Sequence, residues 1–164
     1  MTNLVNLVTS FLVCCFLFAV SFHTSAEWYV DNKPIMGTNI HVELWADSKA
    51  QGQQGLTIVM DEMERINQLM SPYIESSELS QLNSKAAQDY VQVSKELFDL
   101  IAMSKELSKE TFGAFDITFA SIGFLYNYRE HVKPSQQQID QLIEAVNFQH
   151  IALNEESNGI RFTH

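Results

Sequence analysis

The chain is most informative at Thr111-Phe112-Gly113-Ala114-Phe115-Asp116-Ile117-Thr118, where a helical pattern ends in a glycine turn. This turn places one carboxylate, Asp116, between two large apolar residues, Phe115 and Ile117. Such a carboxylate is costly to bury unless a partner hydrogen-bonds it. The partner is either another part of the fold, which makes Asp116 structural, or a ligand, which makes the turn a binding site. The residues of the turn alone leave both interpretations open.

An amphipathic helix leads into this turn. Ser94 is a suitable N-cap, and Glu96 lies in the first helical turn, where a negative charge is favourable. The predicted inner face consists of Leu97, Leu100, Ile101, Ser104, Leu107 and Ser108. Gly113 is predicted to end the helix in a left-handed conformation. A new element rich in Phe and Ile is predicted over residues 117–126.

Two strands are predicted upstream, at residues 27–30 and 39–46. In the second strand apolar and polar residues alternate, as expected when one face of a strand is buried. Residues 31–38 lie between them, contain turn-forming residues and end in Met36-Gly37-Thr38. A glycine at a strand entry allows the backbone to come close to another strand or to a ligand.

A long helix is predicted over residues 48–70. Its apolar stripe consists of Leu56, Val59, Met60, Met63, Asn67 and Met70. Gly52 and Gly55 weaken the first turns, because glycine is a poor helix former. Pro72 ends the helical pattern and leaves Tyr73 on a loop. A tyrosine there is either a packing residue or a flat stacking surface for a planar ligand, and its spacing favours packing.

Shorter elements complete the pattern. Ser76 or Ser77 is predicted to cap a short helix, and Ser135 with Gln138 forms the capping box of another. The predicted short strands span residues 90–93, 148–153 and 159–162. Together these patterns predict a single exported α+β domain of mixed helices and antiparallel strands over residues 27–164.

Residues 1–26 have the pattern of a secretory signal peptide. Residues 4–22 are almost entirely apolar, and the small residues before Glu27 favour cleavage after Ala26. An uncleaved membrane anchor is the alternative, because a membrane span needs about 20 apolar residues. Lipidation at Cys14 is less favoured, because the apolar run continues past it. We therefore expect an exported, periplasmic protein, held at the inner membrane if the segment is retained.

Composition argues against several classes of function. Both cysteines lie within residues 1–26, so the rest of the chain has no disulfide and no cysteine-based metal or redox site. The net charge of −10 argues against nucleic acid and anionic lipid as partners. None of the five histidines has the spacing of a zinc site. The chain also lacks a Gly-x-Ser-x-Gly elbow, a Gly-x-Gly-x-x-Gly turn and a P-loop.

Four short segments resemble the ApbE family, the FAD:protein FMN transferases. In order, they are Ile35-Met36-Gly37-Thr38, Ile66-Asn67-Gln68-Leu69-Met70-Ser71-Pro72-Tyr73, Ser77-Glu78-Leu79-Ser80-Gln81-Leu82-Asn83 and Gly113-Ala114-Phe115-Asp116-Ile117-Thr118. Each segment is weak alone, but all four occur in the family's order. The resemblance implies an ApbE-like, T-fold-like α+β domain.

The resemblance also implies an activity and a set of flavin contacts. In the family, FAD is the donor substrate, Mg²⁺ helps to break its pyrophosphate, and FMN is joined through its phosphate to a Thr or Ser of an acceptor protein. Met36 is implied to contact the flavin, and Tyr73 to stack on or beside the isoalloxazine. The Ala114-Phe115-Asp116 turn is implied to hydrogen-bond FAD and to shape its pocket, which favours the ligand interpretation of Asp116.

The chain also departs from the family pattern. Family members are considerably longer, and their later part carries a glycine-rich Asp-x-Gly-Gly-type segment with a Lys, and the Asp and Thr that bind metal. None of these occurs by His164. We therefore expect the N-terminal part of a transferase domain, inactive alone, with its catalytic residues and metal ligands beyond His164. The alternatives are a complete, non-catalytic flavin-binding or scaffold module and a structural exported domain with accidental matches.

Overall fold

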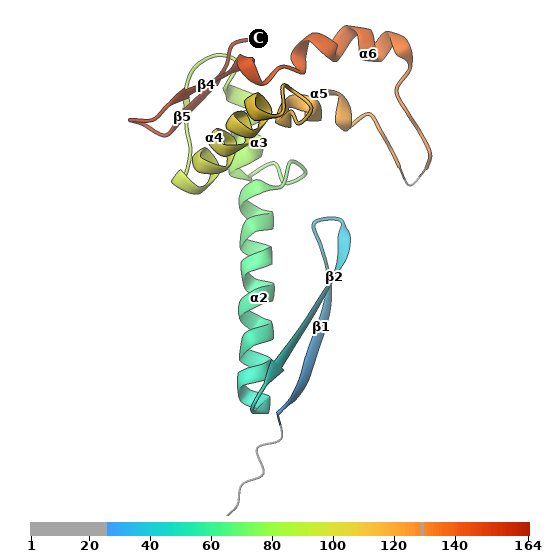
Figure 1. The fold of residues 1–164 in the computed structure, drawn as a ribbon, viewed down its shortest axis with the longest axis vertical. Coiled ribbons are helices and arrows are strands. Elements are labelled where there is room, and N and C mark those ends of the chain that lie inside the picture. Colours follow the sequence, from blue (N-terminus) through green and yellow to red (C-terminus); the bar gives the residue numbers. More distant parts are fainter. Residues whose placement is uncertain (1–25, 129) are drawn as a thin grey trace, which may run out of the picture. The chain divides into compact units, whose positions relative to one another are not determined.

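The computed structural model describes residues 26–128 and 130–164 (Figure 1). The chain forms two compact units that divide after Glu64, within the long helix α2 (Lys49–Met70). The prediction of mixed helices and antiparallel strands is confirmed. The predicted signal segment, up to residue 25, lies outside the described residues. In the part of the chain that the structure describes, no helix has the length and apolar character that a membrane span requires.

The first unit contains an antiparallel hairpin of β1 (Glu27–Ile35) and β2 (Thr38–Ala46). Met36 and Gly37 form its two-residue turn, with φ of 55° and 73°. Two successive positive φ angles are typical of the type I′ turn, whose twist matches that of paired strands. The prediction of a turn over residues 31–38 is wrong, because β1 continues through Pro34. Proline is tolerated there because β1 is an edge strand.

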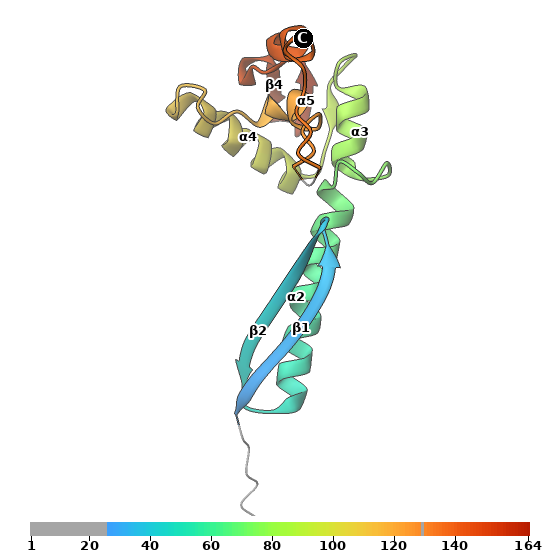
Figure 2. The same ribbon diagram turned by 90° about the vertical axis from the view of Figure 1, so that its right-hand side faces the viewer.

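The hairpin runs alongside the first turns of α2 (Figures 1 and 2). A Cβ atom at Gly52 would lie 2.2 Å from the ring of Tyr29, and one at Gly55 would lie 2.9 Å from the side chain of Leu44. These glycines therefore allow one face of the hairpin to pack closely on the helix. These glycines were predicted to weaken the first turns of the helix, but α2 begins at Lys49 and includes both.

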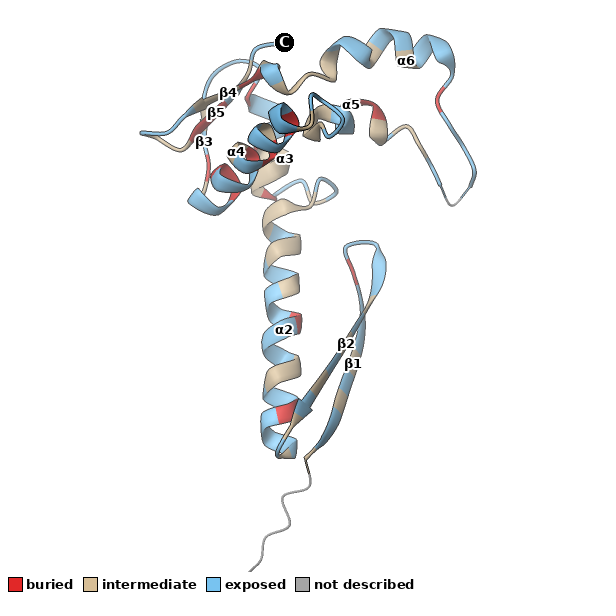
Figure 3. Cartoon of the chain, viewed as in Figure 1, coloured by how far each residue is buried: buried red, intermediate tan, exposed pale blue. Residues whose placement is uncertain are grey.

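The second unit is built around α3 (Glu78–Lys85), α4 (Lys95–Glu110) and a small antiparallel sheet. The sheet order is β3-β5-β4, with strands β3 (Val91–Gln92), β5 (Gly159–Phe162) and β4 (Ile151–Asn154). Its core consists of Leu82, Ala86, Val93, Leu97, Phe98, Ile101, Ile151 and Ile160. Figure 3 shows these buried residues gathered on the two helices and the sheet.

Side-chain caps fix the start of both helices. Ser77, one of the two predicted candidates, caps α3, and Ser94 caps α4 as predicted. The Glu78 carboxylate accepts hydrogen bonds from the Ser94 N–H and from its hydroxyl, the latter at 2.6 Å. Glu78 does more than favour its own helix N-terminus, because it also ties α3 to the start of α4.

The buried face of α4 differs in part from the prediction. Leu97, Ile101 and the two inner serines are buried as expected, but Leu100 and Leu107 are 44% and 42% exposed. Phe98 is buried in their place. The buried stripe therefore extends from Leu97 and Ile101 toward Phe98, and the two leucines lie on its opposite border.

The remaining elements are short. They are η1 (Ile117–Phe119), α5 (Ala120–Gly123), α6 (Gln136–Leu142), η2 (Ile143–Ala145) and η3 (Phe148–His150). The predicted element over residues 117–126 is a 3₁₀ turn and one helical turn that ends at Gly123. The capping box of Ser135 and Gln138 is confirmed. The strand predicted from Phe148 begins only at Ile151, because Asn147 caps a 3₁₀ turn first.

Candidate functional site

The turn after α4 has a conformation that the sequence predicted only in part. The Phe112 N–H bonds to the carbonyl of Lys109 at 3.0 Å, and the Gly113 N–H bonds to that of Ser108 at 2.8 Å. This pair of bonds is the Schellman motif. Gly113 is left-handed as predicted, with φ of 80°, but the residue that directly ends the helix is Phe112, with φ of 54°. The ring of Phe112 is 98% exposed.

Asp116 has internal partners on both carboxylate oxygens. Oδ1 accepts hydrogen bonds from the N–H of Thr118 at 2.9 Å and from its hydroxyl at 2.6 Å. Oδ2 accepts one from the N–H of Phe148 at 2.8 Å. A carboxylate offers about four acceptor positions, so three of them are used within the fold. The structural role of Asp116 is therefore visible, and it fixes the turn against η3.

The other residues of the turn are exposed, and their N–H groups are also occupied. The Ala114 N–H bonds to the Thr111 carbonyl at 3.0 Å, and the Phe115 N–H bonds to the Thr111 hydroxyl at 3.1 Å. The turn can therefore offer a ligand its carbonyl oxygens and the half-exposed ring of Phe115, but not these N–H groups.

The second unit contains an apolar cavity of about 360 Å³ next to this turn. Ile117 and Thr118, which follow Asp116, line one part of it. Met70 and Pro72, which precede Tyr73, line another part. The remaining lining is mostly apolar and includes Leu79, Leu82, Leu97, Ile101, Ile151 and Phe162. The volume lies in the lower part of the range of small-molecule sites.

Tyr73 lies on a loop beside this cavity and is 91% exposed. The packing interpretation of this residue is therefore wrong. The loop is closed by buried Ser77, whose hydroxyl donates to the carbonyl of Ser71 at 2.6 Å. The N–H of Tyr73 also bonds to the Ser71 hydroxyl at 3.2 Å. The backbone that carries Tyr73 is thus held, while its ring is free to meet another molecule.

The structure brings only some of the predicted site residues together. The neighbours of Tyr73 and of Asp116 meet at the same cavity of the second unit. Met36 belongs to the first unit, where it is 46% exposed at the tip of the hairpin.

His150 is a lining residue that the sequence did not single out. Its Nδ1 atom is buried and has no hydrogen-bond partner among the described residues. Its Nε2 atom lies 3.4 Å from the side-chain amide of Asn147, and its ring lies 4.7 Å from that of His164. Buried polar atoms almost always have a partner, so Nδ1 is an exception within the described residues. A lone histidine inside the predicted strand of residues 148–153 gave no sequence signal for this.

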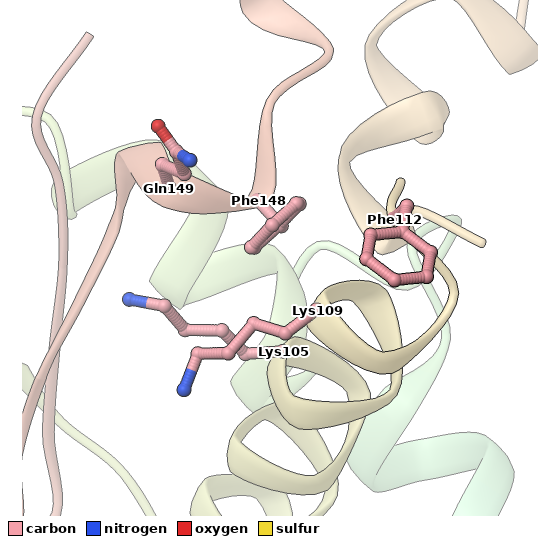
Figure 4. Close-up of a pocket in the computed structure, with 5 residues that line it drawn as sticks. All are labelled: Lys105, Lys109, Phe112, Phe148 and Gln149. Atoms are coloured by element: carbon pink, nitrogen blue, oxygen red, sulfur yellow. The ribbon is translucent and has the colours of Figure 1, made fainter. Parts of the chain in front are cut away.

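A second hollow, of about 570 Å³, lies between α4 and η3. Its lining includes Lys105, Lys109 and the rings of Phe112 and Phe148 (Figure 4). Lys105 donates to the carbonyl of Ile151, and burial, followed by the nearby charge of Lys109, lowers the pKa of its ammonium group. Lys109 pairs with Glu106 at 2.7 Å. Both amines are engaged and the hollow is wide open, so the apolar cavity is the better candidate site.

The side chains in and around the apolar cavity fit the ring of a flavin better than they fit Mg²⁺. The cavity offers an apolar lining and an exposed tyrosine at its edge. By contrast, no three His, Cys, Asp or Glu side chains within the described residues come together in a way that could hold a metal ion.

The ApbE family model matches residues 36–164. The chain belongs to the ApbE family. A curated FAD:protein FMN transferase from Buchnera aphidicola subsp. Schizaphis graminum (strain Sg) is 23% identical over 105 residues, which cover 62% of this chain and 31% of that protein. The resemblance drawn from the four sequence segments is therefore confirmed.

Solved ApbE structures share the fold. The ApbE protein of Thermotoga maritima has a TM-score of 0.72 at 21% identity, over 83% of this chain and 45% of its own. The flavin transferase ApbE from Vibrio cholerae has a TM-score of 0.68 at 24% identity, over 84% of this chain and 46% of its own. The chain thus spans less than half of each of these ApbE proteins.

Proposed function

We propose that this chain forms the flavin-binding part of an FAD:protein FMN transferase. The complete activity would move FMN from FAD to a Thr or Ser of an acceptor protein in the periplasm, at the inner membrane if residues 1–26 are retained. The observation that carries the proposal is the apolar cavity of the second unit, bordered by the loop of Tyr73 and the turn of Asp116. Family membership gives this cavity its ligand class.

Each proposed flavin contact has a physical role. The ring of Tyr73 would stack on the isoalloxazine, because an exposed aromatic face at the edge of an apolar cavity suits a planar ligand. For Met36 of the first unit, the family resemblance alone supports a flavin contact, which its polarisable thioether would make. The turn of Ala114, Phe115 and Asp116 would bound the pocket, with Asp116 holding it in place.

The catalytic residues are proposed to lie beyond His164. Mg²⁺, when bound, acts as a Lewis acid on the pyrophosphate. No described group of side chains is suited to hold it, so the residues of this chain bind and orient FAD and do not cleave it.

The activity test uses the 164-residue chain with FAD, Mg²⁺ and an acceptor protein that carries a Thr or Ser flavinylation site. We expect no covalent flavin on the acceptor, and weak, saturable binding of FAD to the chain. Covalent FMN transfer by this chain alone would refute the placement of the catalytic residues.

The binding site is tested by titrating FAD into the chain and into its Tyr73→Ala variant. Loss of one stacked ring weakens binding by about 1 kcal/mol, which is about a fivefold rise in Kd. Tyr128→Ala is the matched control, because Tyr128 is an exposed tyrosine of the same unit that does not line the cavity. Equal affinities for all three proteins would place the flavin elsewhere.

The second candidate function is a non-catalytic flavin-binding or scaffold module. It is favoured by a formed cavity without a metal-binding group among the described residues. The two candidates differ in the affinity of the isolated chain. Tight FAD binding by a cooperatively folding 164-residue chain would favour the module, whereas weak binding is expected if part of the pocket lies outside this chain.

A further inference from the structure

The outer face of the hairpin carries an exposed tryptophan pair. Trp28 and Trp45 lie directly opposite each other in the strand register. Their rings form an edge-to-face contact, with centroids 5.4 Å apart and planes at 71°. They are 60% and 54% exposed, and the neighbouring Val30 is 48% exposed. Such large apolar groups on a surface call for an explanation.

Packing within the first unit does not account for this pair. The alternate face of the hairpin, with Tyr29 and Leu44, packs on α2. Side chains along a strand alternate between faces, so both tryptophans point away from that contact. An edge-to-face pair stabilises a hairpin, but that role does not require two indole rings that remain more than half exposed.

The position of the pair along the hairpin indicates its partner. Trp28 and Trp45 lie next to the pair Glu27 and Ala46, at the open end of the hairpin and opposite the Met36 turn. The chain enters the first unit at this same end. The tryptophans therefore lie at the end of the hairpin that directly follows residues 1–26 along the chain.

The sequence before the hairpin is apolar from residue 4 to residue 22. The run has close to the roughly 20 apolar residues that a membrane span requires. Only residues 23–27 separate it from Trp28, and a fully extended chain over those steps spans at most about 20 Å. If the run stays in a membrane, Trp28 is held near the membrane surface. Tryptophan is enriched in that layer, because its ring is apolar while its N–H can still donate a hydrogen bond to water or a headgroup.

We propose that Trp28 and Trp45 form a contact with the headgroup region of the membrane that holds residues 4–22. The contact would orient the first unit at the bilayer. Glu27, Glu43 and Asp47 lie beside the pair in sequence or register, so zwitterionic lipid is favoured over anionic lipid. This proposal does not depend on FMN transfer and requires the retained form of the N-terminal segment.

The chain provides its own reporter, because Trp28 and Trp45 are its two tryptophans. The experiment reconstitutes the full 164-residue chain into phosphatidylcholine vesicles and records tryptophan emission. We expect emission to shift to shorter wavelengths. We also expect stronger quenching by lipids brominated near the headgroup than by lipids brominated near the bilayer centre.

A matched control moves the reporter within the same unit. In a Trp28→Phe, Trp45→Phe, Ile58→Trp variant, the single tryptophan lies on α2 at a position that is 60% exposed, like Trp28. Its emission should shift little and be quenched weakly by either lipid. The single variants Trp28→Thr and Trp45→Thr keep one reporter each and preserve strand propensity.

Three outcomes would overturn the proposal. The chain could float with vesicles while its emission stays that of water-exposed tryptophan, which would assign membrane binding to residues 1–26 alone. The chain could fail to associate with vesicles. The emission could instead shift with protein concentration in detergent without lipid, which would make the pair a contact between copies of this chain.

Discussion

Two turns of the molecule look alike in sequence and are held in different ways. Met36-Gly37 joins the strands of the hairpin, and Phe112-Gly113 ends α4. In each pair a large apolar residue precedes glycine and also adopts a positive φ, 55° at Met36 and 54° at Phe112. This conformation is uncommon for residues other than glycine. Both turns belong to segments that we propose to contact flavin.

The difference lies in what surrounds the turns. The Met36 turn is set by its register in a two-stranded hairpin, which is a local arrangement. The Phe112 turn is set by bonds to α4 and is followed by Asp116, which bonds across the fold to Phe148. Strained backbone persists when the structure around it over-determines it. The second turn therefore meets this condition through distant contacts, and the first through the pairing of the strands that it joins.

The largest expected effect comes from Asp116→Ala, which removes the distant contact. Three hydrogen bonds to a half-buried carboxylate are lost, and the free energy of unfolding should fall by about 2–4 kcal/mol. Urea unfolding followed by far-ultraviolet circular dichroism measures this. Asp99→Ala is the control, because its exposed pair with Lys95 on α4 should contribute about 0.5 kcal/mol or less. Equal effects would mean that Asp116 does not hold the turn.

An intermediate effect is expected from alanine at the two glycines. An added Cβ atom meets nothing within 4 Å at either Gly37 or Gly113, so the penalty comes from φ alone. At Gly113 we expect a loss of about 1–2 kcal/mol, and at Gly37 about half of that, because the two-residue turn of a hairpin can readjust with fewer distant contacts to break than the turn after α4. Tryptophan emission reports the unfolding of the first unit, and circular dichroism reports the unfolding of the helices. A larger loss of stability at Gly37 than at Gly113 would contradict this expected order.

The smallest effect is a gain in stability at Phe112. Phe112→Gly should raise the free energy of unfolding by about 0.5–1 kcal/mol, because the left-handed position favours glycine and the exposed ring loses little burial. Phe112→Asn should give part of this gain, whereas Phe112→Val should reduce stability. Destabilisation by both glycine and asparagine would show that the ring itself makes a stabilising contact.

The features predicted correctly from the sequence are those set by neighbouring residues. The caps at Ser77 and Ser94 and the capping box at Ser135 each involve partners within three residues, so their signal is local. The end of α2 before Pro72 is local as well. Four short segments in a fixed order were also enough to indicate the family.

The features that were missed depend on distant partners. Pro34 indicated a turn, but it sits in an edge strand whose pairing sets the real turn at Met36. The two glycines of α2 indicated only weak helix formers. Their role in the close approach of Tyr29 and Leu44 was missed, because that approach is not visible in their own segment. The partner of Asp116 lies on η3, far along the chain, which is why the turn alone left its role open.

The bond from the Phe148 N–H to Asp116 also has a consequence for the order in which the chain folds. The two residues are 32 positions apart, so closing this contact requires ordering a long loop. During synthesis or export, α4 and its capped turn can form from local bonds as soon as they emerge. The turn of residues 114–116 acquires its last anchor only after residue 148 has followed. Until then, the segment proposed to face FAD lacks its final shape, which would delay flavin binding until residue 148 is available to fold.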